Sequence, residues 1–430
     1  MPRDSAKTIY VKGLWHQGLV AAAVWANQGF KVVGLCDSTE EINSLNRGDL
    51  PIFEPGLSDL FMAALQRGNL TFTLQKVDLP PPDFLSFMHD TEVDEFDQVN
   101  LEMFLRDFNS LHCLMLHTNQ ILVTAQLPPG TCESLLEEFR NEHGFEPSMA
   151  YMPENLRLGA AIERFENPPL PVFGMNLENN IESFMELFPR VLSFQSCSLT
   201  EAEILKSALN VFLAISITFG NEISEICDQF SANGFEVMRL LKTEPRIGNQ
   251  LPLLPGMPFS GGTLGRDVQN LQKFSTSGNQ SLIQAIWKSN QHRGKYLIST
   301  ICDIAKTNQL KRVGLLGLTY KPETSTLRRS FPLEVFWGIK SNFDVVAGYD
   351  PMYLDFKEEA PSDLVIVDDL DRIYLESDLL VLTTPWVGIL EYLHIRGIKD
   401  KVLIDPFGAF KDIFRDEPSY YHFGGLRRNN

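Results

Sequence analysis

Two β-α-β patterns, separated by a long segment without helix breakers, predict an α/β fold with two Rossmann-like, doubly wound domains joined by a long central helix. In the first pattern, a β-rich run at 8–13 precedes an apolar stretch with helical spacing at 19–28, and a second β-rich run follows at 30–36. Further strands of the same sheet are expected at 83–88 and 121–125. These lengths are typical of the start of a dinucleotide-binding sheet.

The second pattern follows the central segment. Strands are expected at 312–317, 344–348, 379–382 and 402–404, alternating with helical stretches. Between the two patterns, residues 199–230 keep a helical pattern with few breakers. A helix of that length usually bridges domains or forms a dimer interface, rather than serving as one crossover of a sheet.

Composition narrows the class of protein. A chain of 430 residues is too long for one ordinary core, and 44% hydrophobic with 21% charged residues is normal for a soluble globular protein. No apolar run predicts a membrane span or a signal peptide, so we expect a cytoplasmic protein. The formal charge of −18 argues against nucleic acid or an anionic membrane as a partner, although a local basic pocket can still bind a small anion. The acidic segment 90–97 is expected to form an exposed loop.

The cysteines are scattered, without C-x-x-C pairs or neighbouring histidines. They are Cys36, Cys113, Cys132, Cys197, Cys227 and Cys302. We therefore expect reduced, mostly buried thiols, and neither a disulfide framework nor a metal site.

The first turn, Gly13-Leu-Trp-His-Gln-Gly18, matches the dinucleotide fingerprint G-x-G-x-x-G only in part. The outer glycines, Gly13 and Gly18, are present, but Trp15 stands where a middle glycine lets the pyrophosphate approach the backbone. Asp37 ends the second strand, where a carboxylate binds the adenosine ribose. On its own this pattern is weak, because an ordinary strand–turn–helix with two glycines is at least as common.

A longer set of motifs supports the interpretation of this turn as a dinucleotide-binding turn. Residues 46–57 read NRGDLPIFEPGL, and further strings follow in order at 127–131 (LPPGT), 153–159 (PENLRLG), 202–210 (AEILKSALN), 245–248 (PRIG) and 317–328 (GLTYKPETSTLR). Together these strings resemble the UDP-glucose/GDP-mannose dehydrogenase family over nearly the whole chain. The resemblance implies an enzyme that oxidises the C6 alcohol of a nucleotide sugar to a carboxylate with two NAD in succession.

By this resemblance, the catalytic residues are Lys206 and Asn210 on the central helix, together with Glu154 and Asp267. Lys206 would stabilise the developing oxyanion with Asn210 beside it, since residues four apart share a helical face. Asp267 would position water or Lys206, and Glu154 would act in hydrolysis. Without the flanking motifs, a surface lysine and an ordinary helical asparagine would be the simpler interpretation.

The residue at the position of the family's nucleophile differs from the family pattern. Residues 255–267 (PGMPFSGGTLGRD) resemble the family segment P-G-x-G-F-G-G-S-C-x-x-K-D, and Thr263 stands at the position of the attacking cysteine. A thiol has a pKa near 8.5, whereas an alcohol lies far above that range and needs an adjacent base, which the motif does not contain. The usual covalent route to the acid is therefore expected to be blocked.

Other expected site residues follow from the same resemblance. On the cofactor side they are Gly13, Trp15, Gly18, Asp37, Thr91, Gln126 and Arg328; in two places the family pattern changes, with Gln126 replacing a threonine and Glu92 replacing the proline after Thr91. On the substrate side they are Asn155, Leu156, Arg246, Phe259, Gly261, Gly262, Tyr320 and Lys321. Arg246 would reach the diphosphate across a homodimer interface, because a guanidinium binds phosphate in a fork.

The resemblance implies an NAD-binding domain at 1–198, a central helical dimerisation region at 199–305 and a UDP-type nucleotide-sugar-binding domain at 306–430. NAD is favoured over NADP because Asp37 would repel a 2′-phosphate. Two functions stay open. One is an NAD-dependent dehydrogenase of a UDP- or GDP-sugar that stops at the two-electron stage, with direct oxidation of an aldehyde hydrate as another route to the acid. The other is an inactive nucleotide-sugar or dinucleotide-binding homologue that serves as a partner or regulator.

Overall fold

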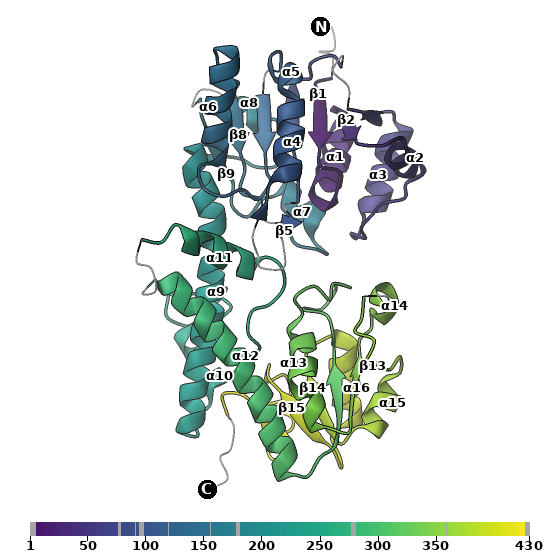
Figure 1. Ribbon diagram of the computed structural model, residues 1–430, viewed down its shortest axis with the longest axis vertical. Coiled ribbons are helices and arrows are strands. Elements are labelled where there is room, and N and C mark those ends of the chain that lie inside the picture. Colours follow the sequence, from purple (N-terminus) through teal and green to yellow (C-terminus); the bar gives the residue numbers. More distant parts are fainter. Residues whose placement is uncertain are drawn as a thin grey trace. The chain divides into compact units, whose positions relative to one another are not determined.

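A computed structural model describes residues 6–75, 79–90, 92–93, 99–118, 120–154, 156–177, 181–276, 281–357 and 359–425. The chain divides into two compact units, Met1–Ala208 and Leu209–Asn430, and each is described by itself. The long helix α9 (Leu199–Gln229) begins in the first unit and continues into the second (Figure 1). The predicted fold is confirmed: two largely parallel sheets and a long connecting helix.

The N-terminal unit is built on an eight-stranded sheet of order β10-β9-β8-β7-β4-β1-β2-β3. Its strands are β1 (Thr8–Lys12), β2 (Lys31–Cys36), β3 (Leu70–Leu74), β4 (Phe84–Phe87), β7 (Gln120–Val123), β8 (Met149–Tyr151), β9 (Val172–Met175) and β10 (Gln195–Cys197). Strand β9 runs antiparallel to β8, and the other neighbouring pairs are parallel. The central strands are apolar because both faces of the sheet are covered.

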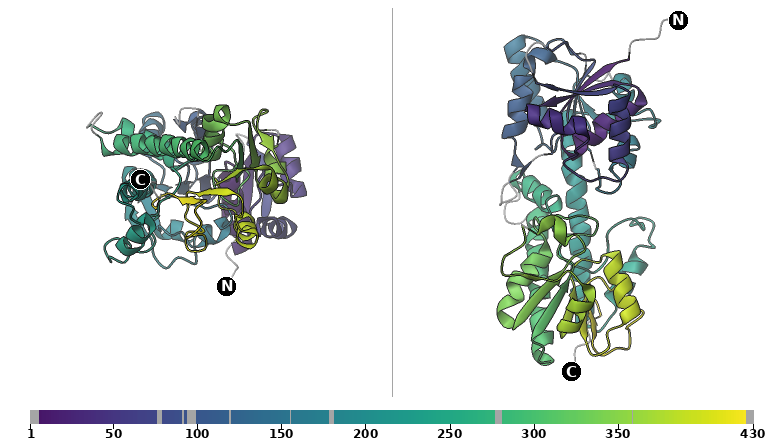
Figure 2. Two further views of the ribbon diagram at one scale, coloured as in Figure 1. Left: turned by 90° about the horizontal axis from the view of Figure 1, so that it is seen from below. Right: turned by 90° about the vertical axis from the view of Figure 1, so that its right-hand side faces the viewer.

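Helices cover both faces of this sheet, as Figure 2 shows. One face carries α1 (His16–Gln28), α2 (Thr39–Arg47), α3 (Leu57–Gln66), α7 (Ala161–Glu166) and α8 (Ile181–Met185). The other face carries α4 (Glu102–Ser110), α5 (His112–Met115), α6 (Thr131–His143) and the first turn of α9. Along β1, Ile9 and Val11 face the first core and Tyr10 faces the second, which is the period-two alternation of a strand.

The acidic segment is not entirely a loop. Glu92–Val93 (β5) pairs antiparallel with Val99–Asn100 (β6) in a two-stranded ribbon. The rest of the predicted loop, apart from Asp90, lies outside the described residues.

The C-terminal unit contains a fully parallel sheet of order β13-β12-β11-β14-β15-β16. Its strands are β11 (Arg312–Leu316), β12 (Val345–Tyr349), β13 (Val365–Ile366), β14 (Leu379–Leu382), β15 (Val402–Asp405) and β16 (Tyr420–His422). One face packs against α12 (Leu282–Thr307), α13 (Phe331–Ile339) and α14 (Tyr353–Phe356), and the other against α15 (Leu370–Glu376) and α16 (Val387–Arg396). The short 3₁₀ helix η3 (Lys340–Asn342) follows α13.

Two more helices, α10 (Gly234–Leu241) and α11 (Leu264–Lys273), complete this unit. Helix α11 packs against α9 and α12 through Val268, which shares a small core with Ala214 and Ile286. Helix α9 is long and apolar enough to span a bilayer by composition alone, but half of its most apolar stretch is buried inside the protein. It is therefore a core helix.

Candidate active site

The turn after β1 can be built only with glycines at its two ends. Gly13 has φ +91°, and a Cβ there would lie 2.8 Å from the His89 backbone nitrogen. A Cβ on Gly18 would lie 2.0 Å from the Gly13 carbonyl oxygen. The turn therefore brings the start of α1 directly against the end of β1, which is the cradle that a dinucleotide pyrophosphate uses. Trp15 precedes α1, and its side chain is half exposed rather than packed beneath the helix. These residues fit a dinucleotide.

A buried cation lies beside this turn. Lys12 is 2% exposed, and its Nζ lies 2.5 Å from Asp37 Oδ1 and 3.5 Å from Asp107 Oδ2. His89 Nε2 lies 2.9 Å from the same Asp107 oxygen. Burial alone would raise the pKa of Asp107, but the hydrogen bond from His89 and the charge of Lys12 outweigh burial and lower it. Asp37 stays largely exposed at the end of β2, so Lys12 fixes its carboxylate without covering it.

Glu154 and Lys206 meet in the N-terminal unit, as the resemblance implies. The Lys206 ammonium donates to the backbone carbonyl of Glu154, and Gln17 Nε2 donates to Glu154 Oε2 at 2.7 Å. Thr124 in turn donates to Gln17 Oε1, so the start of α1, the end of β7 and α9 meet around Glu154, with Gln17 on its carboxylate and Lys206 on its backbone carbonyl. Glu154 Oε1 is buried and has no hydrogen-bond partner among the described residues.

The surroundings of the Glu154 carboxylate suit it to act as a base. Burial raises the pKa of Glu154, and the positive charge of Lys206 opposes that rise without cancelling it. A carboxylate with a raised pKa binds a proton more strongly than an exposed glutamate does. Its unpartnered oxygen is therefore suited to accept a proton from a substrate hydroxyl or from water.

Glu54 explains why three separate sequence motifs lie together. Its carboxylate accepts hydrogen bonds from the backbone nitrogens of Gly159 (3.1 Å) and Ala161 (2.9 Å) at the start of α7. His16 Nε2, in the glycine turn, lies 3.0 Å from Glu54 Oε2. The 46–57 string therefore ties the first turn to the segment after Glu154. Sequence reasoning singled out the string but not this role of Glu54.

In the C-terminal unit, the loop 255–262 packs against the turn after β11. A Cβ on Gly261 would lie 2.6 Å from the Tyr320 ring, so only glycine lets the loop approach this closely. The Gly261 nitrogen also donates to the Arg329 carbonyl at 3.0 Å. Two predicted substrate residues, Gly261 and Tyr320, are thus brought together. Lys321 Nζ lies 5.5 Å from the centroid of the same ring.

Polar side chains on α9 and α12 bond the backbone of the 255–262 loop, and the sequence analysis did not predict this role for them. Asn290 accepts from the Phe259 nitrogen at 2.8 Å and donates to its carbonyl at 2.9 Å. The buried Arg293 guanidinium donates twice to the Gly256 carbonyl, at 2.9 and 3.0 Å, and Asn221 bonds the Gly256 nitrogen. Three buried side chains on α9 and α12 therefore fix the path of the loop that carries Phe259.

Thr263 is the N-cap of α11, and its side chain is exposed. The Asp267 nitrogen donates to the Thr263 carbonyl in the first turn of α11. Asn210 Nδ2 on α9 donates to Asp267 Oδ2 at 2.5 Å. Arg266 Nε lies 3.1 Å from Asp267 Oδ1. The expected pair Asn210 and Asp267 is therefore in contact within the C-terminal unit, and Asp267 is fully buried.

The two cysteines of the C-terminal unit are separated along their helices from the residues that pack against α11. Helix α11 packs near Ala214 and Ile286, and Cys227 lies about 20 Å further along α9 than Ala214. Cys302 lies about 24 Å further along α12 than Ile286. Burial also raises the pKa of Cys227, so this thiol is a poor nucleophile.

The remaining predicted residues occupy varied positions. Gln126 is buried just after β7, Leu156 packs at the edge of the N-terminal core, and Gly262 is half-buried next to Gly261. Arg328 is exposed, and Arg246 is exposed beyond α10, with its Nε 2.9 Å from Glu244 Oε1. Thr91 and Asn155 lie outside the described residues.

A largely parallel sheet with a glycine turn after its first strand, a carboxylate at the end of its second strand and a lysine bonded to the backbone of a nearby glutamate are features of dinucleotide-dependent dehydrogenases. The chain belongs to the UDP-glucose/GDP-mannose dehydrogenase family. The family's NAD binding domain matches residues 7–192, its central domain 200–292 and its UDP binding domain 314–412.

Curated relatives and solved structures agree with this assignment. The chain is 26% identical to a UDP-glucose 6-dehydrogenase from Rickettsia bellii, over 91% of this chain and 93% of the relative. It is 27% identical to a GDP-mannose 6-dehydrogenase from Azotobacter vinelandii, over 87% and 90%. Its fold matches a UDP-glucose dehydrogenase structure from Pyrobaculum islandicum with a TM-score of 0.84, covering 99% of this chain and 100% of that one at 24% identity.

Proposed function

We propose that this protein is an NAD-dependent oxidoreductase that acts on the C6 alcohol of a UDP- or GDP-sugar and stops at the two-electron stage. The observation that carries the proposal is the buried Glu154, which is held by Gln17 at the glycine turn and contacts Lys206. A binding protein without catalysis would gain nothing from a buried, partly unpartnered carboxylate, which costs stability.

In this proposal, NAD bound at the glycine turn supplies the hydride acceptor. Lys206 stabilises the negative charge that develops on the C6 oxygen, and Asn210 lies one helical turn further along the same face. Glu154 Oε1 accepts the alcohol proton directly or through water. Asp267 holds Asn210 in place.

Thr263 sets where the reaction stops. An N-cap position lowers the pKa of a thiol, because the helix dipole favours an anion there. The same field is too weak to ionise an alcohol near neutral pH, whose pKa is far higher. Without a covalent ester on residue 263, the aldehyde has no route to the acid except oxidation of its hydrate.

The first test follows NADH absorbance with NAD and a panel of UDP- and GDP-sugars. We expect NADH formation with at least one nucleotide sugar. Tight binding of a nucleotide sugar without NADH formation would overturn the proposal that the protein is an enzyme. It would favour the alternative, a regulatory or partner role.

Replacing Thr263 with cysteine should produce uronic acid. The new thiol would sit at the N-terminus of α11, where its thiolate is stabilised, and it could trap the aldehyde as a hemithioacetal. Product analysis by mass spectrometry would detect the acid, and Thr263→Ser is the matched control because serine has the shape of cysteine but keeps the hydroxyl of the wild type. Absence of acid from the cysteine variant, with unchanged NADH formation, would contradict the proposed role of position 263.

The substrate side of the proposal uses the 255–262 loop and the segment after β11 in the C-terminal unit. Phe259, Gly261 and Gly262 would surround the sugar, and Tyr320 and Lys321 would approach the nucleotide. Residues 1–198 would bind NAD, with Asp37 on the adenosine ribose, while residues 306–430 would bind the nucleotide. The cytoplasm, where nucleotide sugars and NAD are both soluble, is the proposed location.

The central region 199–305 would form a homodimer. Phe212, Phe219 and Ile226 recur every seven residues on α9 and are 51%, 44% and 48% exposed. Side chains at that spacing lie on one face of a helix, and an exposed apolar stripe of this kind marks an interface. A second copy of α9 supplies a matching stripe, because a two-fold interface is self-complementary. Arg246, 87% exposed, would then reach the partner's substrate.

Replacing Phe219 with aspartate should convert the dimer to a monomer, raising the dimer dissociation constant at least about 100-fold, since a charge would be buried in the centre of an apolar interface. Light scattering with size-exclusion chromatography measures this directly. Leu354→Asp is the control, because Leu354 is also an exposed apolar residue but lies on α14. A monomeric wild-type protein would contradict the proposed interface.

A further inference from the structure

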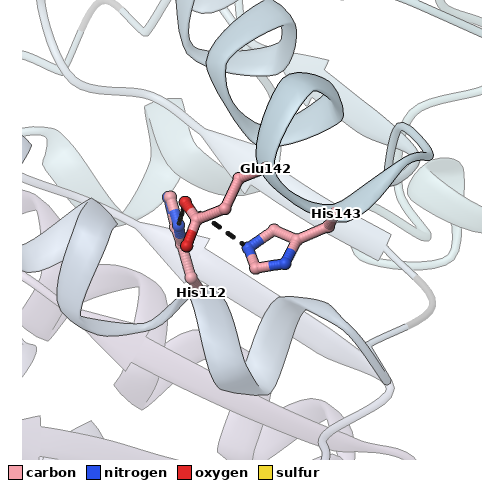
Figure 3. Close-up of side chains that lie close together, drawn as sticks. All are labelled: His112, Glu142 and His143. Atoms are coloured by element: carbon pink, nitrogen blue, oxygen red, sulfur yellow. Dashed lines mark ion pairs between the residues drawn. The ribbon is translucent and has the colours of Figure 1, made fainter.

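A cluster of two histidines and one carboxylate lies on the N-terminal unit, away from the residues discussed above. His112 belongs to the short helix α5, and Glu142 and His143 form the last turn of α6. Figure 3 shows the Glu142 carboxylate between the two imidazole rings. One ligand atom from each residue lies within 4.8 Å of the others.

We propose that His112, Glu142 and His143 bind one divalent transition-metal ion of the Zn²⁺ type. Two imidazoles and one carboxylate are a ligand set that Zn²⁺ accepts, with a fourth position left for water. Magnesium and calcium prefer oxygen ligands alone and are not expected here.

The distances fit this chemistry. Ligands about 2.0–2.2 Å from a tetrahedral Zn²⁺ lie roughly 3.3–3.5 Å from one another. His112 Nδ1 lies 3.4 Å from Glu142 Oε2, and His143 Nε2 lies 3.7 Å from the same oxygen. Both distances lie close to this range, and all three ligand atoms lie within 4.8 Å of one another, so rotation of the side chains can bring them to coordinating geometry.

The hydrogen bonding of the cluster points to a ligand. His143 Nε2 faces Glu142 but is too distant for a hydrogen bond, and it is buried without a hydrogen-bond partner among the described residues. Buried nitrogens of this kind are costly unless something satisfies them.

The rings are already held in place by aromatic packing. Phe139 on α6 contacts both, with ring centroids 5.1 Å from His112 and 4.4 Å from His143. Glu142 is 62% exposed, so an ion can enter from solvent and keep water as its fourth ligand.

The position of the cluster in the fold defines its role. Helix α5 precedes β7 and helix α6 ends before β8, so both lie at the amino ends of the parallel strands. The glycine turn, Asp37 and Glu154 follow the carboxyl ends of their strands. The metal would therefore join α5 to α6 and stabilise the unit, without taking part in hydride transfer. No sequence motif predicts this cluster, because His112 and the Glu142–His143 pair belong to different elements.

The test uses the full chain without a histidine tag, stripped with a chelator and titrated with Zn²⁺ by calorimetry. We expect one Zn²⁺ per chain and a rise in melting temperature. His143→Ala and Glu142→Gln should each weaken binding at least about tenfold. Glu142→Gln keeps the size of an exposed side chain, so loss of binding in that variant cannot be attributed to misfolding.

The matched control is His292→Ala. His292 on α12 is exposed and lies 3.5 Å from Glu225, but it belongs to no cluster of three ligand side chains among the described residues. Its replacement should leave Zn²⁺ binding unchanged. Absence of saturable binding, or binding that survives both Glu142→Gln and His143→Ala, would overturn the proposal.

Discussion

Replacing Lys206 with methionine is expected to lower kcat for nucleotide-sugar oxidation by about 10²–10³-fold, the usual effect of losing one donor to a developing oxyanion. Methionine keeps the length of the side chain but removes its charge. The Glu154 carbonyl also loses its donor, so local order around the carboxylate declines as well. Initial rates of NADH formation at saturating substrate measure the effect.

The same variant should shift the acid side of the pH profile. Burial raises the pKa of Glu154 and Lys206 lowers it, so removing Lys206 raises it further. Activity requires the ionised carboxylate and is lost as pH falls through that pKa. The acid limb of kcat/KM should therefore move to higher pH in Lys206→Met.

Lys288→Met is the control for this experiment, because Lys288 is an exposed lysine on α12. Its kcat and pH profile should match the wild type. A Lys206→Met enzyme with wild-type kcat would remove Lys206 from the proposed mechanism.

Replacing Glu203 with alanine should destabilise the protein by about 2–6 kcal/mol, because two buried backbone donors would lose their acceptor at roughly 1–3 kcal/mol each. Glu203 on α9 is fully buried and accepts hydrogen bonds from the backbone nitrogens of Gly130 (2.6 Å) and Cys132 (2.8 Å). These nitrogens begin α6 and have no helical partners of their own, so alanine would leave them unsatisfied and open a cavity. Chemical denaturation gives the free energy of unfolding.

The pH dependence of this effect has a definite sign. Burial raises the pKa of Glu203 above its unfolded value, and the bonds from Cys132 and Gly130 reduce that rise. The folded state then binds the proton more tightly, so the stabilisation from Glu203 is complete below the unfolded pKa and declines as pH rises through the folded pKa. The gap in stability between wild type and Glu203→Ala should narrow over that window.

The exposed Glu137 on α6 provides the comparison for Glu203. Glu137→Ala should change the free energy of unfolding by no more than about 0.5 kcal/mol. Equal destabilisation by the two variants would show that the buried contact to the start of α6 is not the cause.

The sequence predicted the fold well because its signals are local. β-rich composition marked β1 and β2, and the absence of breakers marked α9 within a residue of its observed end. Gly13 and Gly18 could be assigned to a tight turn because only glycine tolerates the contacts found there. The family motifs then placed Glu154 and Lys206 in one site.

The supporting residues could not be predicted, because they act across elements far apart in the sequence. Lys12 looks like any lysine in a strand, and only the fold places its ammonium between Asp37 and Asp107. Gln17 reads as a helical surface residue until Glu154 is brought against it. Arg293 lies on α12, and its contact with the 255–262 loop depends on tertiary packing.

The chemical fate of the aldehyde at residue 263 decides between the proposed two-electron oxidation and full conversion to the acid. The direct measurement is the product of the wild-type enzyme acting on its nucleotide sugar while NADH is continuously reoxidised, identified by NMR and mass spectrometry. We predict the C6 aldehyde or its hydrate, with one NADH formed per sugar. Uronic acid with two NADH per sugar, together with a substrate ester on Thr263, would contradict it.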